Sequence, residues 1–304
     1  MMQKFNTLME LMEAFPDEQS AIDHFRSIRW ADGASCPHCG STKVYHFSDN
    51  RTHKCGDCRQ RFSIKVGTIF EDSKIPLRKW FMAIWMIASH KKGISSVQLA
   101  KDIGITQKSA WFVMHRLRFA ARTKSFNKPL DGEVELDETF IGGKEKNKHK
   151  HKRSENRGRD SKTAVFGMLE RGGDLRAMKM ENLKGKTIRK VVHQHVKKGA
   201  NLLTDEFKGY NSLRKTYYRF TVNHSAGEYV KHYFIHINGL EGAWGHFKRQ
   251  VNGTHHWISS KHLDRYLDEF TWRWNRRDMD EGPRVNDMLK AMAGCRLTYK
   301  ALIA

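Results

Sequence analysis

Two closely spaced cysteine pairs constrain the fold of this 304-residue chain more than any other feature. The pairs are Cys36-Pro-His-Cys39 and Cys55-Gly-Asp-Cys58, with 15 residues between the inner cysteines. Two such knuckles bring four thiolates into a tetrahedron, which is the geometry of a structural zinc site. We predict that Zn²⁺ folds this module, because a segment of this size lacks a core of its own. A redox dithiol or a chance spacing is the alternative.

The predicted zinc ribbon covers residues 31–70, with strands at residues 43–47 and 60–64. Gly40 and Gly56 fit its tight turns. Cationic side chains on the ribbon allow contact with DNA phosphates. A ribbon that only mediates protein contacts fits the same residues.

The chain is strongly basic along its whole length. Lys and Arg number 55 against 33 acidic residues, which gives a formal net charge of +22. Such an excess favours a polyanionic partner, and nucleic acid is the first expectation. A membrane is not expected, because the most apolar stretch, residues 80–88, is about half as long as a membrane span. The first residues lack the apolar core of a secretion signal, so we predict a cytoplasmic protein that is nucleoid-associated when bound to DNA.

Helices are predicted before the acidic part of the chain. Residues 1–30 form a helical lead-in, and residues 71–125 form a helix-turn-helix DNA-binding domain with its tight turn at Gly104. Amides and hydroxyls at the exposed start of the helix after this turn can contact base edges, while cations hold phosphates. Packing of three helices with a basic exterior explains the same residues. The predicted DNA-binding side chains are Gln107, Lys108, Ser109, His115 and Arg116.

An acidic strand is predicted at residues 133–143, EVELDETFIGG. Apolar and polar side chains alternate there with the period of two that is typical of a β-strand. Glu135 and Asp137 therefore share one face, and Glu138 points to the other. A carboxylate within an apolar strand is costly unless it is paired or bound to metal, so Asp137 is a candidate metal ligand. Solvated acids on an outer face are the alternative.

The following segments predict an α/β domain, a mixed sheet with flanking helices. Three strands, a helix and a further strand come in the order that a ribonuclease H-like domain requires. Asp205 ends the last of these strands, at the edge where ligands gather in open α/β sheets. The predicted elements are strands at residues 163–170 and 175–180, a helix at 184–196, and strands at 200–207 and 219–224.

A further helix is predicted at residues 236–253, HINGLEGAWGHFKRQVNG. Glu241 and Lys248 lie about two turns apart on one stripe of this helix, and Gly245 between them leaves that face open. An exposed acid and base on a surface helix is the alternative. The neighbouring core stripe consists of Leu240, Trp244, Phe247 and Val251.

Asp137, Asp205 and Glu241 offer three carboxylates with no cysteine or histidine among them. Such a set suits hard cations, Mg²⁺ or Mn²⁺. Two such ions can activate a water or a 3′-hydroxyl for attack on a phosphodiester. Lys248 then holds a DNA phosphate near the metals, with Arg249 as a further DNA contact.

The motifs together resemble the DDE transposases of bacterial insertion sequences that carry an N-terminal zinc ribbon, the ISXO-type group. The matching pieces include the CPHC and CGDC pairs, VELDETFIGGK, LLTDEFKGY and HINGLEGAWGHFKR, and they extend over nearly the whole chain. The resemblance implies that Asp137, Asp205 and Glu241 are the metal-binding triad and that Lys248 is the lysine that follows it. Some relatives carry Asn at the third acidic position, which leaves Asn238 as an alternative ligand.

The resemblance implies a DNA transposase that binds terminal inverted repeats and catalyses metal-dependent strand cleavage and strand transfer. Its partners are double-stranded DNA and further copies of the chain, as a homo-oligomer. The catalytic domain spans residues 130–280, with a charged loop at 144–162 that either clamps DNA or is simply solvated, and a C-terminal tail spans 281–304. A nuclease or resolvase on the same fold, or a DNA-binding regulator with an inactive ribonuclease H-like domain, remain the alternatives.

Overall fold

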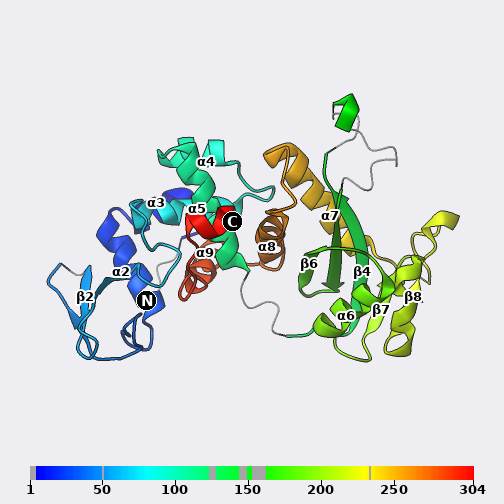
Figure 1. Cartoon of the computed structure of the whole chain (residues 1–304), viewed down its shortest axis with the longest axis horizontal. Helices are drawn as coiled ribbons and strands as arrows, with labels where there is room; N and C mark the ends of the chain where they lie inside the picture. The colour runs from blue at the N-terminus through cyan, green and yellow to red at the C-terminus, as the bar shows by residue number, and fades with distance from the viewer. Residues whose placement is uncertain (1–4, 50, 123–127, 144–148, 153–161, 233) are drawn as a thin grey trace. The chain divides into compact units, whose positions relative to one another are not determined.

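The computed structural model describes residues 5–49, 51–122, 128–143, 149–152, 162–232 and 234–304 (Figure 1). The chain divides into two compact units, one of Met1–Ala121 with Asp278–Ala304 and one of Arg122–Arg277. The residues predicted as a C-terminal tail therefore belong to the same unit as the N-terminal residues. Most of the charged loop 144–162, and with it the prediction of a DNA clamp, lies outside the described residues.

The first unit joins a three-stranded ribbon to a helical core. Asp17 opens α2 by accepting the Ser20 N–H at 2.8 Å, which satisfies a backbone donor at the helix start. His24 on α2 contacts Asn286 on α9, with Nε2 and Oδ1 2.8 Å apart, so α9 packs on the lead-in helices. The helices are α1 Leu8–Ala14, α2 Glu18–Arg29, α3 Leu77–Ser89, α4 Ser96–Ile103, α5 Gln107–Ala121, α9 Glu281–Lys290 and α10 Tyr299–Ile303. The ribbon strands are β1 Val44–His46, β2 Thr52–Cys55 and β3 Arg61–Ser63.

Capping residues and one glycine set the turn between α4 and α5. Ser95 accepts the Gln98 N–H at 3.1 Å at the start of α4. Gly104 ends α4 in the left-handed region at φ 61°, which a glycine adopts without strain. Thr106 then accepts the Ser109 N–H at 3.2 Å in the first turn of α5. The predicted helices and tight turn are present, and a DNA-binding helix-turn-helix at this place stays a prediction.

The second unit is built on a mixed five-stranded sheet of order β6-β5-β4-β7-β8. β5 runs antiparallel to β4 and β6, whereas β7 runs parallel to both β4 and β8. The predicted mixed sheet is therefore confirmed. Its strands are β4 Glu133–Ile141, β5 Thr163–Glu170, β6 Leu175–Met180, β7 Asn201–Thr204 and β8 Tyr218–Thr221.

Helices cover both faces of this sheet. α6 (Gly185–His195) packs on the face that carries Val134 and Leu136 of β4. α7 (Asn238–Gln250) and α8 (Leu263–Trp274) pack on the opposite face. The predicted core stripe of α7 is confirmed, because all four of its side chains are buried. Of the helices in the described part of the chain, none has the length and apolar character of a membrane span.

Gly167 on β5 lets α7 approach the sheet. It pairs with Asp137 on β4, and a Cβ added to it would lie 2.4 Å from Cζ2 of Trp244. We expect Gly167→Ala to lower the free energy of unfolding by about 1–3 kcal/mol, because a rigid indole must move. Gly242 is the matched control: it is exposed on α7 with open space around it, so Gly242→Ala should stabilise by about 0.5–1 kcal/mol. Urea denaturation measures both, and equal effects of the two would contradict the packing argument.

Candidate active site and zinc centre

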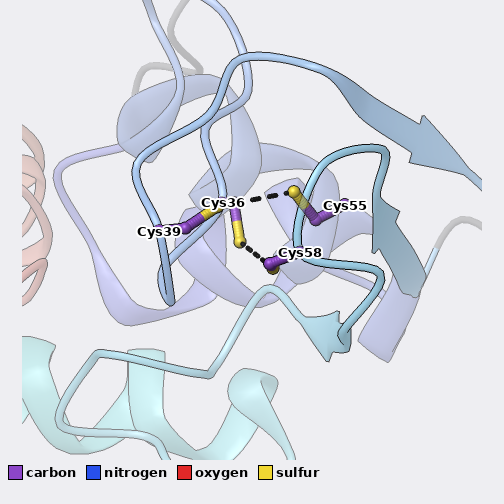
Figure 2. Close-up of side chains that lie close together, drawn as sticks. All are labelled: Cys36, Cys39, Cys55 and Cys58. Atoms are coloured by element: carbon purple, nitrogen blue, oxygen red, sulfur yellow. Dashed lines mark hydrogen bonds between the residues drawn. The ribbon is translucent and has the colours of Figure 1, made fainter.

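The four predicted zinc ligands converge. Their sulfur atoms all lie within 4.8 Å of one another, with Cys36 and Cys58 Sγ 3.7 Å apart and Cys39 and Cys55 Sγ 3.6 Å apart (Figure 2). A tetrahedron of Zn–S bonds of about 2.3 Å has edges of about 3.8 Å, so these distances fit Zn²⁺. The backbone N–H of His38 donates to Cys36 Sγ at 3.4 Å, as expected around a thiolate. The cluster fits a structural zinc site.

Each zinc knuckle ends in a left-handed residue. Gly40 follows the first cysteine pair with φ 77°, and Arg59 follows the second with φ 62°. The second turn therefore places a non-glycine residue where glycine is favoured, and the predicted turn residue Gly56 has no such φ.

We expect Arg59→Gly to tighten zinc binding by about five- to thirtyfold and Gly40→Ala to weaken it by a similar factor. A left-handed backbone costs a non-glycine residue about 1–2 kcal/mol, and folding of the ribbon is coupled to metal binding. Competition with a chromogenic chelator measures both affinities. Opposite signs for the two changes are required, and a loss of affinity in both would contradict the prediction.

The predicted DNA-binding residues of α5 separate into two groups. Gln107 and Lys108 are exposed, and the half-buried Ser109 donates its N–H to the capping Oγ1 of Thr106. His115 is fully buried and Arg116 is only 6% exposed, so the prediction that they face DNA is wrong. Arg116 instead donates to the carbonyls of Ile69 at 2.6 Å and Glu71 at 2.9 Å. It faces inward because these carbonyls need a donor within the first unit.

The parallel pairing of β4 with β7 sets Asp205 beside Asp137. Glu135 of β4 lies across from Leu203 of β7, and extending this register by two residues reaches Asp137 and Asp205. Neighbouring strands lie about 4.8 Å apart, so the two carboxylates leave adjacent strands at the same edge of the sheet. The predicted strand at 200–207 ends at Thr204, which leaves Asp205 in the first position after the strand.

Cations and backbone donors fix the environment of Asp205. Its Oδ1 accepts the Phe207 N–H at 3.0 Å. Arg219 on β8 donates to the Asp205 carbonyl at 2.9 Å and to Thr204 Oγ1 at 2.8 Å. These contacts hold the strand end in place.

Glu241 approaches the same edge from α7. Its Oε1 lies 3.6 Å from Nδ1 of His224, the residue that follows β8 by a short turn. Lys248 and Arg249 are exposed further along the helix, and Lys248 lies on the Glu241 stripe as predicted. Asn238, the alternative ligand, is exposed at the first position of α7.

The charges at this edge act on one another. Burial raises the pKa of Asp137 to about 8, and the neighbouring charges of Glu138, Asp205 and Glu241 add to this. Burial also raises the pKa of Asp205. Among the described residues, the four cysteines are the one group whose metal-ligating atoms all lie within 4.8 Å of one another, so the carboxylates are further apart. The three carboxylates are nevertheless hard oxygen donors at one sheet edge, a set that suits a divalent cation.

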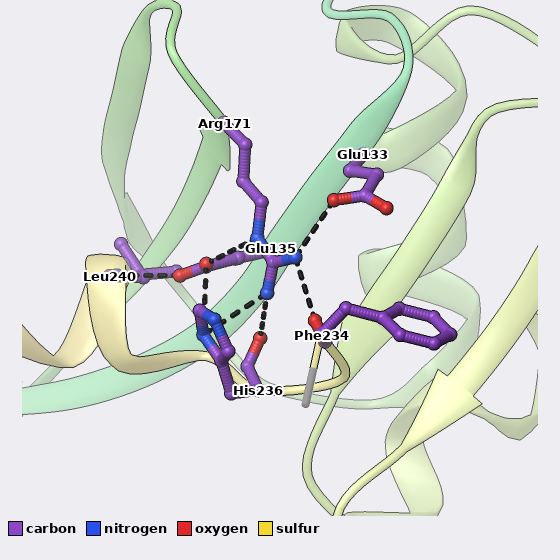
Figure 3. A network of polar contacts seen from close by, with 6 residues as sticks. All are labelled: Glu133, Glu135, Arg171, Phe234, His236 and Leu240. Carbon is purple, nitrogen blue, oxygen red and sulfur yellow. Dashed lines mark hydrogen bonds and ion pairs between the residues drawn. The ribbon is translucent and has the colours of Figure 1, made fainter. Parts of the chain in front are cut away.

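An ion-pair network around the buried Glu135, beside this edge, was not predicted (Figure 3). Glu135 is 1% exposed, and its two oxygens accept from Arg171 Nε at 3.0 Å and from the Leu240 N–H at 2.7 Å. Arg171 also binds Glu133 at 2.8 Å and the carbonyls of Phe234 at 2.7 Å and His236 at 2.8 Å. The strand thereby holds the first turn of α7, one residue before Glu241. The lone Arg in the turn after β5 was the only sequence signal.

Glu138 points to the other face of the sheet, as predicted. Its Oε2 accepts the hydroxyl of Tyr210 at 2.5 Å. Tyr210 is buried in the core beneath α6, and both burial and the Glu138 charge raise its pKa. The sequence did not predict this contact, because Tyr210 lies 72 positions after Glu138.

The fold and its two sites define a protein with a four-cysteine ribbon and an α/β unit with an acidic sheet edge, formed by Asp137, Asp205 and Glu241. Residues 129–275 match the ISXO2-like transposase domain, and residues 16–61 match the transposase zinc-ribbon domain. The chain therefore belongs to the IS1595 family of transposases.

Individual relatives agree with this assignment. A protein of the transposable element ISH50 of Halobacterium salinarum is 28% identical over 278 residues, which cover 86% of this chain and 92% of that protein. A transposase-like protein of Haemophilus influenzae is 30% identical over 102 residues, or 32% of this chain and 78% of that protein. A pre-cleavage Mos1 transpososome structure is 11% identical, covering 72% of this chain and 79% of that chain. The TM-score of this last comparison is 0.25, too low to support the fold or the family.

Proposed function

We propose that this chain is a DNA transposase with a ribonuclease H-like catalytic domain. It binds the terminal inverted repeats of its element, cleaves DNA strands and joins them to a target, as a homo-oligomer on paired ends. Asp137, Asp205 and Glu241 are proposed to hold Mg²⁺ or Mn²⁺. The observation that supports the proposal is the parallel register of β4 and β7, which sets Asp205 beside Asp137 at a sheet edge that Glu241 approaches from α7.

Each residue has a separate task in this proposal. When bound, the metal ions supply the Lewis acidity that activates a water or 3′-hydroxyl and stabilises the leaving oxygen. Arg219 keeps the end of β7 in place, so that Asp205 stays beside Asp137. Lys248, exposed on the Glu241 stripe, binds a DNA phosphate. His224, whose Nδ1 lies 3.6 Å from Glu241 Oε1, orients this carboxylate.

DNA recognition is proposed for the exposed part of the first unit. Gln107 and Lys108 at the start of α5 are exposed and can contact bases and phosphates. Ser109 is half-buried and supports the start of this helix, because its N–H donates to Thr106 Oγ1. Arg249 adds a cation beside Lys248. The net charge of +22 supports strong binding to any DNA at low salt, so specific binding must be measured against competitor DNA.

The proposal is tested with labelled DNA that carries the ends of the element, in the presence of Mg²⁺ or Mn²⁺. Cleavage followed by joining supports a transposase. Cleavage without joining would instead establish a nuclease or resolvase. Specific binding to the ends without any chemistry, with either metal, would overturn the enzyme and leave a DNA-binding regulator.

Metal affinity is expected to depend on pH through Asp137. Its pKa of about 8 keeps this carboxyl mainly protonated at neutral pH, and a cation must displace that proton. The affinity for Mn²⁺ should therefore fall about tenfold for each pH unit below 8. Calorimetric titration at several pH values measures this, with Asp137→Asn as the variant that loses the steep dependence. An affinity that is flat from pH 6 to pH 8 would contradict the assignment of Asp137 as a ligand.

A further inference from the structure

A hollow of about 630 Å³ lies where α7 ends, near the end of β4. We call it the Trp257 hollow; its lining includes Lys162, Lys248, Asn252, His256 and Trp257. Its size is within the range of ligand pockets. None of the described residues that line it is acidic, so it favours an anionic ligand.

Trp257 is unusually exposed for a residue between two core positions. Its side chain is 67% exposed, whereas Val251 and Ile258 on either side of the turn are buried in the core. A large indole surface is thus held in water, although nearby aromatic residues of the same unit find places in the core. An exposed tryptophan in a cationic hollow indicates a ligand with a flat apolar face.

The backbone that presents Trp257 is strained. α7 changes into a π-helical turn over Val251–His255, and His256 follows at φ 60° and ψ −40°. Left-handed non-glycine residues and π-helical turns both occur preferentially at functional sites. Trp257 directly follows this strained residue, where the helical path of α7 ends.

Buried polar contacts with α8 stabilise the π-helical turn Val251–His255. Arg273 on α8 donates to Gln250 Oε1 at 2.8 Å and to Glu269 Oε1 at 2.8 Å. Gln250 in turn contacts His255 at 3.4 Å between Nε2 atoms, and the His255 ring lies 4.9 Å from that of Tyr266. The turn is therefore ordered before any ligand arrives, which lowers the entropic penalty of binding.

The Trp257 hollow lies close to the proposed active site. Lys248 lines it and follows Glu241 by seven residues on the same helix, a rise of about 10 Å. In duplex DNA this corresponds to about three nucleotides along one strand. A strand whose phosphate lies at Glu241 can therefore place a nucleotide about three positions away in the hollow.

We propose that the Trp257 hollow binds one unpaired nucleotide of DNA. The base stacks on the indole of Trp257, and Lys162 and Lys248 bind the adjacent phosphates. The base must be unpaired, because base faces are covered by their neighbours in an intact duplex. An acidic peptide would satisfy the lysines but offers no flat face to the indole. The proposal rests on the proposed function only in taking DNA as the ligand.

Photocrosslinking tests the placement of the base. The full chain is irradiated with a short oligothymidylate that carries one 5-iodouracil, with excess duplex DNA as competitor, and the crosslinked peptide is mapped by mass spectrometry. The crosslink is expected at Trp257, to be lost in Trp257→Ala and kept in Trp257→Phe. Tyr218→Ala is the matched control, because Tyr218 on β8 is 69% exposed and does not line the hollow.

Affinity for the same oligonucleotide gives a second readout. Trp257→Ala should weaken it about 5- to 150-fold, the range of one base stacked on an aromatic side chain. Lys248→Ala should lower the slope of log affinity against log salt by about 0.7, the value for one phosphate of a single strand. Unchanged affinity in Trp257→Ala, with crosslinks elsewhere, would overturn the proposal.

Neither measurement needs strand cleavage. A chain that crosslinks at Trp257 but never cuts DNA would refute the proposed function and support the nucleotide site. A chain that cuts and joins DNA with crosslinks only at other residues would support the proposed function and refute the nucleotide site.

Discussion

Asp137→Asn, Asp205→Asn and Glu241→Gln are each expected to reduce strand cleavage and joining by about a thousandfold or more, while binding to the element's ends is retained. Removing one preorganised electrostatic group from an active site costs about a hundred- to a thousandfold in rate, and a lost metal ligand acts on both ions and substrate. Single-turnover assays on labelled ends measure cleavage, and gel-shift titration with competitor DNA measures binding.

These substitutions should leave the fold intact. The raised pKa of Asp137 means that ionisation of this carboxyl destabilises the folded state at neutral pH, so Asn in its place removes no stabilisation. Glu241 is half exposed and its contact with His224 contributes little to stability.

Asp131→Asn is the matched control for these variants. Asp131 precedes β4 and pairs with Lys197 at 2.7 Å on the exposed surface, away from the acidic edge. Full activity in this variant and loss in the other three would assign the chemistry to the edge. Cleavage that survives Glu241→Gln but not Asn238→Ala would replace Glu241 by Asn238 as the third ligand.

The parts of the fold that the sequence predicted rest on local periodicity and spacing. β4 alternates apolar and acidic residues, α7 repeats its apolar residues every three or four positions, and the cysteine pairs define their own geometry. Each pattern depends on neighbouring residues only, so one sequence is enough to read it. The expectation that the three carboxylates lie near one another required one further assumption, the order of the strands in the sheet.

The parts that the sequence missed depend on contacts between distant segments. Arg116 looked like a surface cation on a basic helix, but its guanidinium meets carbonyls 45 and 47 positions earlier. Glu135 meets Arg171 at a separation of 36 residues, and Arg171 meets His236 at 65. Charged residues are normally exposed, so composition alone points the wrong way when such a residue is buried and paired.

Glu135→Ala is expected to lower the free energy of unfolding of the second unit by about 3–5 kcal/mol, because it leaves Arg171 without its buried partner and the Leu240 N–H without an acceptor. Domains of this size are stable by about 5–15 kcal/mol, so this loss is a large part of the unit's stability. Urea denaturation measures the total, and hydrogen exchange at the Leu240 amide measures the start of α7.

Glu133→Gln is the matched control for this change. Its carboxylate binds the same guanidinium at 2.8 Å but is 40% exposed, so its loss should matter by less than about 1 kcal/mol. Glu135→Gln keeps an oxygen for Leu240 and should fall between the two, whereas Glu135→Leu with Arg171→Met removes both charges and should recover part of the loss. Because Leu240 immediately precedes Glu241, cleavage should fall in the order of the Leu240 exchange rates. A Glu135→Ala chain as stable as Glu133→Gln, with unchanged exchange at Leu240, would show that the network does not hold α7 against the acidic edge.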